Sequence, residues 1–348
     1  MELIVNIEKR LRDFTLAAQF TLRDTTLALL GASGSGKSMT LKCIAGLERP
    51  DRGQIVLNGR TLFDSAKGIN LPPQARSVGY LFQNYALFPN MTVRENIIFA
   101  LDGSQEEKER IFKENVARFF LDGLEHAYPA GLSGGQQQRV AFARILARGA
   151  DVLLLDEPLS ALDTHLKWQI ETALREILTM QDISAILVTH DRDEAFRIAQ
   201  EIATVDRGQL TPPMDKHELF RNPGTRAATT LTGCKNISAA HRVDETHVAA
   251  TDWGITLRVA NAATDVRHIA VRAHYLVLAS ENDVDALPAR IAEVIESTFT
   301  YIVMLRFADG AMPIRWEIDK ATWHAHEAGI GDTLYFNFPV EELMLLRD

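Results

Sequence analysis

The sequence predicts an α/β domain followed by a smaller all-β domain. Three observations support this: short apolar strands alternate with amphipathic helices, a glycine-rich loop joins one such strand to a helix, and the later part of the chain changes to short strands of alternating polarity. A chain of 348 residues is long enough for two domains. We place the first at 1–230 and the second at 236–348, because the pattern changes after the turn sequence Asn222-Pro223-Gly224.

The first domain opens with two strands. Apolar residues occupy alternate positions from Leu3 to Ile7 and again from Phe14 to Leu22, which is typical of antiparallel strands at the edge of a sheet. Beyond them, buried strands alternate with amphipathic helices, and this implies a parallel sheet with helices on its faces. The expected strands are 27–30, 152–155, 186–188 and 202–205, and the expected helices are one that ends near Gly46 and one over 166–178.

The second domain has apolar residues at alternate positions in several short segments, with turn residues between them. Such a pattern is typical of a small barrel of short strands. The segments are 255–259, 301–307, 314–318 and 334–338.

The bulk composition argues against two classes of protein. The net charge of -9 argues against a nucleic-acid-binding protein, because a phosphate backbone recruits clustered Lys and Arg. No apolar run reaches the roughly 18 residues that cross a bilayer, so we expect any membrane role to come through partners. The opening 1–10 resembles a strand and not a signal peptide. Cys43 and Cys234 lack disulfide or metal spacing, so we expect buried thiols in a reducing cytosol.

A glycine-rich loop lies between the strand 27–30 and the next helix. Its sequence fits the phosphate-loop pattern GxxxxGK(S/T) in the strand-then-helix context that the pattern requires. The glycines let backbone N–H groups wrap around phosphate oxygens, Lys37 would reach the β- and γ-phosphates, and the Ser38 hydroxyl would ligate Mg²⁺. The predicted nucleotide-binding residues are Gly31, Ala32, Ser33, Gly34, Ser35, Gly36, Lys37, Ser38 and Met39.

Two carboxylates follow the apolar strand 152–155. Alone, Asp156 and Glu157 are as consistent with a strand terminus as with a site. Beside a phosphate loop they acquire a chemical meaning: Asp156 can hold Mg²⁺, and Glu157 can polarise the water that attacks the γ-phosphate.

A second loop that leads into a helix identifies the family. The run Leu132, Ser133, Gly134, Gly135 and Gln136 resembles the signature sequence of ABC ATPases. The resemblance implies a phosphate-loop ABC ATPase fold, with a mixed sheet, an antiparallel edge hairpin and a helical subdomain. It also implies a homodimer in which two subunits face head to tail, so that each signature loop contacts the ATP held by the partner subunit.

Three further motifs match the family in the expected order. Gln83 resembles the glutamine that reaches Mg²⁺ and the attacking water and reports the site to membrane subunits. His190 resembles the histidine that contacts the γ-phosphate. The loop that crosses the dimer interface is matched by Ser160, Ala161, Leu162 and Asp163. By this resemblance Glu157, His190 and Gln83 are the predicted catalytic residues, and Ser38, Gln83 and Asp156 the predicted Mg²⁺ ligands.

The adenine-stacking residue is open. Members of the family stack the base on an aromatic side chain near the end of the first hairpin, where Phe14 is the nearest candidate. Leu11 occupies the equivalent place as an alternative, and Phe14 equally fits the apolar alternation of its strand.

The cargo is predicted from one loop. Residues 64–73, with Lys67-Gly68-Ile69 and two prolines, resemble an insertion in the ATPases of molybdate importers, although an ordinary variable loop is the alternative. The resemblance implies molybdate uptake, with sulfate, sugar, polyamine or iron as alternatives. It also implies integral-membrane permease subunits, an indirect periplasmic or surface solute-binding protein, and a peripheral location on the cytoplasmic face of the membrane. A non-transport ABC ATPase switch is the remaining alternative.

The segment 232–236 resembles the usual entry to an accessory domain of the oligomer-binding-fold type (TOBE/MOP-type). In relatives this domain packs against its copy and in some it binds the transported oxyanion. Arg272 and His274 stand where relatives have a different sequence. Either could contact an anion, or both could lie on a solvated rim of the barrel.

Overall fold

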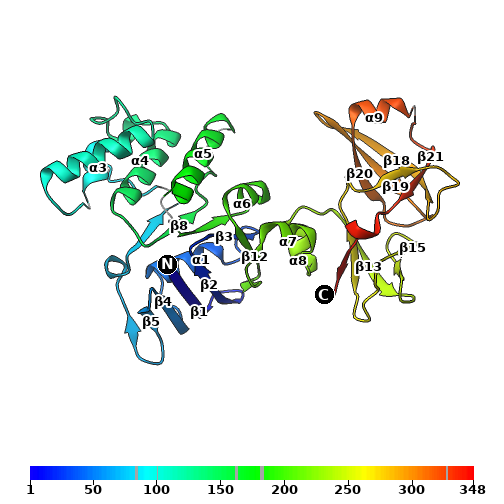
Figure 1. Cartoon of the computed structure of the whole chain (residues 1–348), viewed down its shortest axis with the longest axis horizontal. Coiled ribbons are helices and arrows are strands. Elements are labelled where there is room, and N and C mark those ends of the chain that lie inside the picture. Colours follow the sequence, from blue (N-terminus) through cyan, green and yellow to red (C-terminus); the bar gives the residue numbers. More distant parts are fainter. Residues whose placement is uncertain (83–84, 100, 161–163, 181–183, 327) are drawn as a thin grey trace. The chain divides into compact units, whose positions relative to one another are not determined.

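The computed structural model describes residues 1–82, 85–99, 101–160, 164–180, 184–326 and 328–348. The chain forms two compact units, Met1–Lys216 and His217–Asp348 (Figure 1). Gln83 and the run Ala161, Leu162 and Asp163 lie outside the described residues.

The first unit is built on one sheet of twelve described strands. Strand pairing is antiparallel from β6 to β2 and parallel from β10 through β3, β9 and β8 to β7. In spatial order the strands are β6 (Ile69–Asn70), β5 (Arg60–Asp64), β4 (Arg52–Leu57), β1 (Glu2–Arg10), β2 (Thr15–Arg23), β11 (Gln209–Leu210), β10 (Glu201–Asp206), β3 (Thr26–Gly31), β9 (Ser184–Thr189), β8 (Val152–Asp156) and β7 (Val78–Leu81), with β12 (Met214–Asp215) paired to β10.

The apolar pattern explains both halves of this sheet. In the β1–β2 pair, Leu3 faces Leu22 and Val5 faces Phe20, so the alternate apolar residues share one buried face. The parallel strands β3, β8 and β9 are buried at every position, as expected for strands covered on both faces. The predicted mixed α/β fold with an antiparallel hairpin is therefore confirmed.

Helices complete the first unit. α1 begins directly after the glycine-rich loop and ends at Gly46, which adopts the left-handed conformation with φ 79°. α2 and α3 pack against α4 in a helical region (Figure 1). The helices are α1 (Lys37–Ala45), α2 (Val93–Ile98), α3 (Gln105–Arg118), α4 (Gly134–Ala147), α5 (Thr164–Met180) and α6 (Arg192–Ile198), with short 3₁₀ turns at Pro73–Ala75 and Pro129–Gly131.

The second unit is mainly β, which confirms the predicted class. Its strands form two antiparallel five-stranded sheets, in the orders β15-β14-β13-β16-β22 and β17-β21-β18-β19-β20. Their bounds are β13 (Asn236–Arg242), β14 (His247–Ala250), β15 (Ile255–Arg258), β16 (His268–Val271), β17 (Val277–Ala279), β18 (Leu287–Glu296), β19 (Thr300–Arg306), β20 (Ile314–Asp319), β21 (Thr333–Asn337) and β22 (Met344–Leu346). The helices are α7 (Lys216–Arg221), α8 (Arg226–Leu231) and α9 (Lys320–Ala325), with a 3₁₀ turn at Val340–Glu342.

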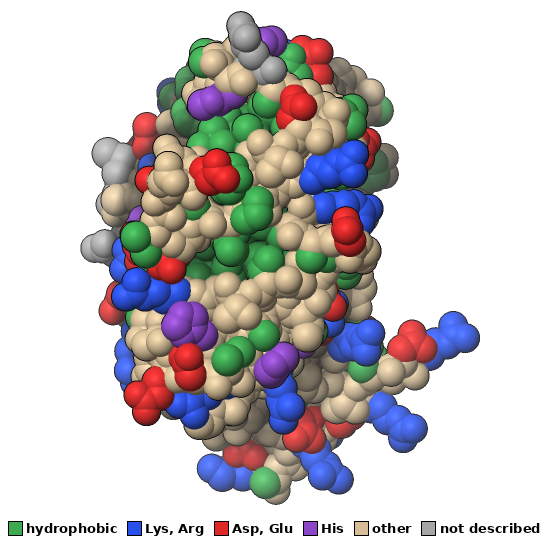
Figure 2. Space-filling view, turned by 90° about the vertical axis from the view of Figure 1, so that its right-hand side faces the viewer, with side chains coloured by type: hydrophobic (Ala, Val, Ile, Leu, Met, Phe, Trp, Pro, Cys, Tyr) green, Lys and Arg blue, Asp and Glu red, His purple; other side chains and the backbone are tan. Residues whose placement is uncertain are grey.

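Side chains join the two sheets of this unit. The Asn236 side-chain amide donates to the Arg315 backbone carbonyl at 2.7 Å and accepts from the Arg315 backbone N–H at 2.8 Å. These two hydrogen bonds link β13 to β20. Trp316 and Phe336 pack edge to face at 4.9 Å in the core between them. On the face shown in Figure 2, Lys and Arg side chains are interspersed with Asp and Glu.

Arg272 has a structural position in the second unit. Its guanidinium donates to the Thr232 and Phe220 carbonyls at 2.8 and 2.6 Å and lies over the Phe220 ring. The anion-contacting alternative for this residue stays a prediction. The His274 ring packs on Tyr275.

Both cysteines are buried free thiols, as predicted. In the described part of the chain, no helix combines the length and the apolar character needed to span a membrane.

Candidate active site

The carboxyl ends of three neighbouring parallel strands build the site. β3 ends at Gly31 and leads into the glycine-rich loop, β8 ends at Asp156, and β9 ends at Thr189, one residue before His190. Because parallel strands in adjacent positions end at the same edge of a sheet, motifs far apart in sequence meet there.

The loop from Gly31 to Gly36 requires its glycines. Gly34 and Gly36 have φ values of 80° and 110°, a backbone conformation that favours glycine. A Cβ on Gly31 would lie 2.3 Å from the Val205 carbonyl oxygen, so the loop also packs too closely on β10 for a side chain there.

Lys37 is the first residue of α1, and its side chain reaches back into this loop. Its Nζ donates to the Gly31 and Ala32 carbonyls, each at 2.8 Å, and the side chain is buried. The pKa of Lys37 is lowered, because the effect of burial outweighs the opposite effect of the nearby Glu157 and Asp156 carboxylates. A phosphate group bound in the loop would therefore neutralise the charge of this buried ammonium.

The amino end of α1 offers further donors. Gly36 at the N-cap has no side chain to accept from the first backbone N–H groups of α1, whereas Thr92, Ser104 and Ser133 cap α2, α3 and α4. Free N–H groups and the positive end of a helix dipole bind an anion. The loop thus fits the phosphates of a nucleotide.

Asp156 lies at the centre of a hydroxyl cluster. Ser38 Oγ donates to its Oδ1 at 2.6 Å, and Tyr80 Oη donates to its Oδ2 at 2.9 Å. Burial raises the pKa of Tyr80, and the Asp156 charge adds to the effect, so the phenol stays protonated. A carboxylate and a hydroxyl beside a phosphate site are oxygen donors of the kind that Mg²⁺ selects, so these residues fit the ion.

Glu157 turns away from β8 with a positive φ of 48°. Its N–H donates to the Val188 carbonyl at 3.0 Å, and its own carbonyl accepts from Ser160 Oγ at 2.9 Å. These bonds hold a backbone conformation that a Glu rarely adopts. The strained turn directs the chain from Asp156, at the end of β8, into the segment that carries Ser160.

The structure brings together the side chains of His190 and Glu157, and their catalytic roles stay a prediction. His190 Nδ1 lies 3.4 Å from Glu157 Oε1. The Glu157 side chain is 17% exposed and that of His190 55%, so the pair faces solvent from which water can enter.

A charged network behind His190 was missed by sequence reasoning. Asp191 caps α6 by accepting from the Asp193 and Glu194 N–H groups, and Lys167 Nζ donates to it at 2.6 Å. Thr189 Oγ1 donates to Glu194 Oε2 at 3.1 Å. An Asp at an N-cap followed by acidic residues is a recognisable helix start, but the partner Lys167 lies on α5 and carries no local signal.

Glu194 is the buried acid of this network. Its side chain is 3% exposed, and burial raises its pKa to about 7, although Lys167 and the Thr189 hydroxyl oppose the shift. Glu194 Oε1 is buried without a hydrogen-bond partner among the described residues. Thr189, which directly precedes His190, is thus hydrogen-bonded to a carboxyl group whose pKa lies near neutral pH.

The signature loop forms a separate helix start. Ser133 and Gln136 make a reciprocal capping box, in which Gln136 N donates to Ser133 Oγ and the Gln136 side chain accepts from Ser133 N. Leu132 is buried, Gly135 is buried, and a Cβ on Gly134 would meet no described atom within 4 Å. The loop therefore has a glycine surface open to another molecule.

Phe14 lies next to the phosphate loop. A Cβ on Gly36 would be 3.5 Å from the Phe14 ring, and one on Gly208 would be 2.4 Å from it. The ring is half-buried between these glycines, and the Leu11 N–H donates to the Phe14 carbonyl. Adenine stacking by Phe14 stays a prediction, since the same contacts are those of a packing residue.

Comparison with known proteins adds the family. The family model described as ABC transporter matches residues 18–160. The Fe(3+) ions import ATP-binding protein FbpC of Brucella abortus is 37% identical over 288 residues, which cover 78% of each chain. This chain belongs to the ABC transporter family.

Other relatives agree with this assignment to ABC ATP-binding proteins. The sulfate/thiosulfate import ATP-binding protein CysA of Synechocystis is 38% identical over 242 residues, which span 68% of this chain and 66% of the relative. A solved dimer of the ATP-binding cassette MJ0796 with ADP and Pi has a TM-score of 0.53 and 27% identity, and the match covers 62% of this chain and 99% of the cassette. The ABC cassette fold of this chain is therefore shown by both sequence and structure.

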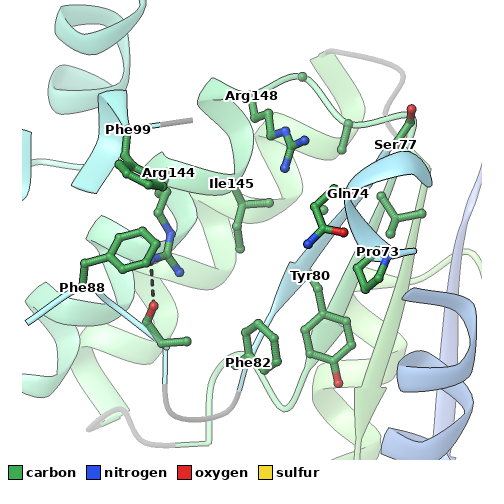
Figure 3. A pocket seen from close by; sticks show the side chains of 15 residues that line it. Pro73, Gln74, Ser77, Tyr80, Phe82, Phe88, Phe99, Arg144, Ile145 and Arg148 are labelled. Atoms are coloured by element: carbon green, nitrogen blue, oxygen red, sulfur yellow. Dashed lines mark hydrogen bonds between the residues drawn. The ribbon is translucent and has the colours of Figure 1, made fainter. Parts of the chain in front are cut away.

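A groove of about 420 Å³, lined in part by Phe82 and Ala86, opens in this ABC cassette (Figure 3). Arg144, on the signature helix α4, donates to the Ala86 and Tyr85 carbonyls at 2.8 and 3.0 Å and lies over the Phe88 ring. Tyr85 and Ala86 have positive φ values of 60° and 42°, so Arg144 holds a strained backbone in place. The aromatic residues on the groove are Tyr80, Phe82, Phe88 and Phe99.

Proposed function

We propose that this chain is the ATP-hydrolysing subunit of an ABC importer. The observation that carries the proposal is the convergence of Lys37, the Ser38–Asp156 pair and the Glu157–His190 pair at one edge of the sheet. The import ATP-binding names of CysA and FbpC support the transport part of the proposal.

The chain's own residues account for the hydrolytic step. The phosphate loop and Lys37 bind the phosphates, and Lys37 stabilises negative charge that develops on the γ-phosphate. Ser38 and Asp156, with Gln83, would hold Mg²⁺, which supplies charge neutralisation when bound. Glu157 accepts a hydrogen bond from the attacking water and polarises it. His190 beside Glu157 orients this carboxylate and contacts the γ-phosphate.

We propose a homodimer as the working unit. The exposed glycine at Gly134 leaves room for a phosphate to approach the signature loop. The amino end of α1 has no side-chain cap, so its N–H groups can bind a phosphate. Two copies facing head to tail would place each signature loop on the ATP of the other copy. The segment from Ser160 to Asp163 would lie between them.

The groove beside 85–88 is the proposed docking site for a permease subunit. Tyr80 belongs to this groove and its hydroxyl binds Asp156, so one side chain joins the surface to the nucleotide site. Apolar rings next to the Arg144 guanidinium fit a short amphipathic segment of a membrane protein. This arrangement would place the chain on the cytoplasmic face of the membrane, with a solute-binding protein acting on the far side.

The cargo is proposed to be an inorganic ion. Relatives with sulfate/thiosulfate or Fe(3+) in their names match over most of the chain, whereas the molybdate proposal rests on one loop. In that loop Asp64 Oδ1 accepts from the Ala66 and Lys67 N–H groups, and Gly68 has φ 68°, so a hairpin turn accounts for its residues. We therefore give sulfate and Fe(3+) precedence over molybdate.

The experiment is ATPase activity of the chain reconstituted with its permease and solute-binding protein, with sulfate, Fe(3+) or molybdate added. We expect stimulation by sulfate or Fe(3+). Stimulation by molybdate alone would favour molybdate over sulfate and Fe(3+) as the transported ion. An absence of ATP hydrolysis with every solute would contradict the proposed motor function.

A further inference from the structure

Asp156 is held by two hydroxyls that come from different elements. Ser38 lies on α1 and donates to Oδ1, while Tyr80 lies on β7 and donates to Oδ2. The parallel pairing of β7 with β8 sets Tyr80 opposite Leu154, two residues before Asp156. Ser38 belongs to the phosphate loop and has a predicted role, whereas Tyr80 lies in the sequence run around Gln83 and no role is predicted for it.

The position of Tyr80 is well defined by its surroundings. The ring packs on Phe82 with centroids 4.5 Å apart and against the core of the first unit. Asp156 is 6% exposed, so little water is available to replace the phenol as its donor.

A donor on each oxygen of Asp156 matters for a bound metal ion, because two donors restrict rotation of the carboxylate more than one does. Mg²⁺ requires near-ideal octahedral geometry, so the plane of a ligating carboxylate must be fixed. One hydrogen bond, from Ser38, leaves the carboxylate able to rotate about its Cβ–Cγ bond. A second donor on the other oxygen removes this freedom, and outer partners of this kind tune metal affinity by about 10–100-fold.

We propose that Tyr80 is a positioning residue that orients the Asp156 carboxylate toward the metal ion of the ATP site. This inference rests on the proposed ATPase function.

The test is metal affinity in the Tyr80→Phe variant. The probe is Mn²⁺, whose binding to the intact chain is followed by electron paramagnetic resonance in the presence of a non-hydrolysable ATP analogue. We expect Mn²⁺ affinity to fall about 10-fold, because only the hydroxyl is lost and the ring still packs on Phe82. Affinity for the nucleotide without metal should stay close to that of wild type, while the melting temperature should fall modestly because the buried Asp156 carboxylate loses one donor.

Tyr85→Phe is the matched control. It removes a phenol from the same segment, but that hydroxyl reaches Gln138 at 3.5 Å instead of Asp156. We expect it to bind Mn²⁺ as wild type does. A second variant, Tyr80→Leu, removes the hydroxyl together with the ring and should lose at least as much metal affinity.

Two outcomes separate the inference from the proposed function. Wild-type Mn²⁺ affinity in Tyr80→Phe would overturn the positioning role and leave the ATPase proposal intact. A wild-type chain that binds neither nucleotide nor Mn²⁺ with nucleotide would overturn both.

Discussion

At the scale of single residues, the site combines polar side chains that lie in different environments. Lys37 is buried in its loop, whereas His190 is largely exposed, and Glu157 lies between them near both. A buried cation next to carboxylates is suited to receive a polyanion, and an exposed acid–imidazole pair is suited to receive water.

Glu194 gives a prediction of pH dependence. Its folded-state pKa of about 7 lies above the usual 4.5, so the folded state holds this proton more tightly than the unfolded chain does. The resulting stability is fully present below pH about 4.5 and is lost as the pH rises through about 7. Glu194→Gln cannot titrate. The stability of wild type relative to this variant should therefore fall by on the order of 3 kcal/mol across that range.

Thermal melts of both proteins from pH 4.5 to 8 provide the measurement. The exposed Glu176→Gln on α5 is the control and should follow wild type at every pH. Parallel curves for wild type and Glu194→Gln would show that Glu194 does not change its protonation across this range.

At the scale of elements, α1 is held at its carboxyl end by a distant part of the chain. Its amino end carries the phosphate loop. At its carboxyl end, the fully buried Arg76 donates to the Cys43 and Ile44 carbonyls, each at 2.8 Å, and to the Leu71 carbonyl. Carbonyls at a helix end need such partners, and a basic side chain suits the negative end of the helix dipole.

Arg76→Met should destabilise the first unit by about 3 kcal/mol, because it leaves buried carbonyls without donors. Denaturant unfolding measures this loss. Arg60→Met is the control, since Arg60 is exposed on β5 and its replacement should change stability little. Equal stability of the two variants would contradict the capping role.

Contacts between elements are the part of the structure that could not be predicted from the sequence. Local periodicity and spacing predicted the strands β1, β2, β3, β8, β9 and β10, the helices α1 and α5, and the motifs at 31–38, 132–136 and 156–157. The strands β4 to β7 and the helices α2 and α3 were not predicted. Tyr80–Asp156 and Arg76–Cys43 were not predictable, because each depends on which elements become neighbours in the sheet. For the first of these contacts, the sequence offered only the polar hydroxyl of a Tyr on the half-buried strand β7.

At the scale of the whole molecule, the chain joins an ABC cassette to an all-β unit. The cassette contains every predicted catalytic residue that the structure describes, and the all-β unit has its own aromatic core around Trp316. Each unit therefore has the core it needs to fold around its own residues. The cassette carries the residues that we propose for ATP hydrolysis. We propose that partner subunits bind the cargo.

The most direct test of the central claim is phosphate release from Mg-ATP by the purified chain, compared between wild type and Glu157→Gln. The amide keeps the size of the side chain but cannot polarise water as a carboxylate does, so we predict a loss of at least about 100-fold in turnover with ATP binding retained. Turnover at the wild-type rate in Glu157→Gln would contradict the account.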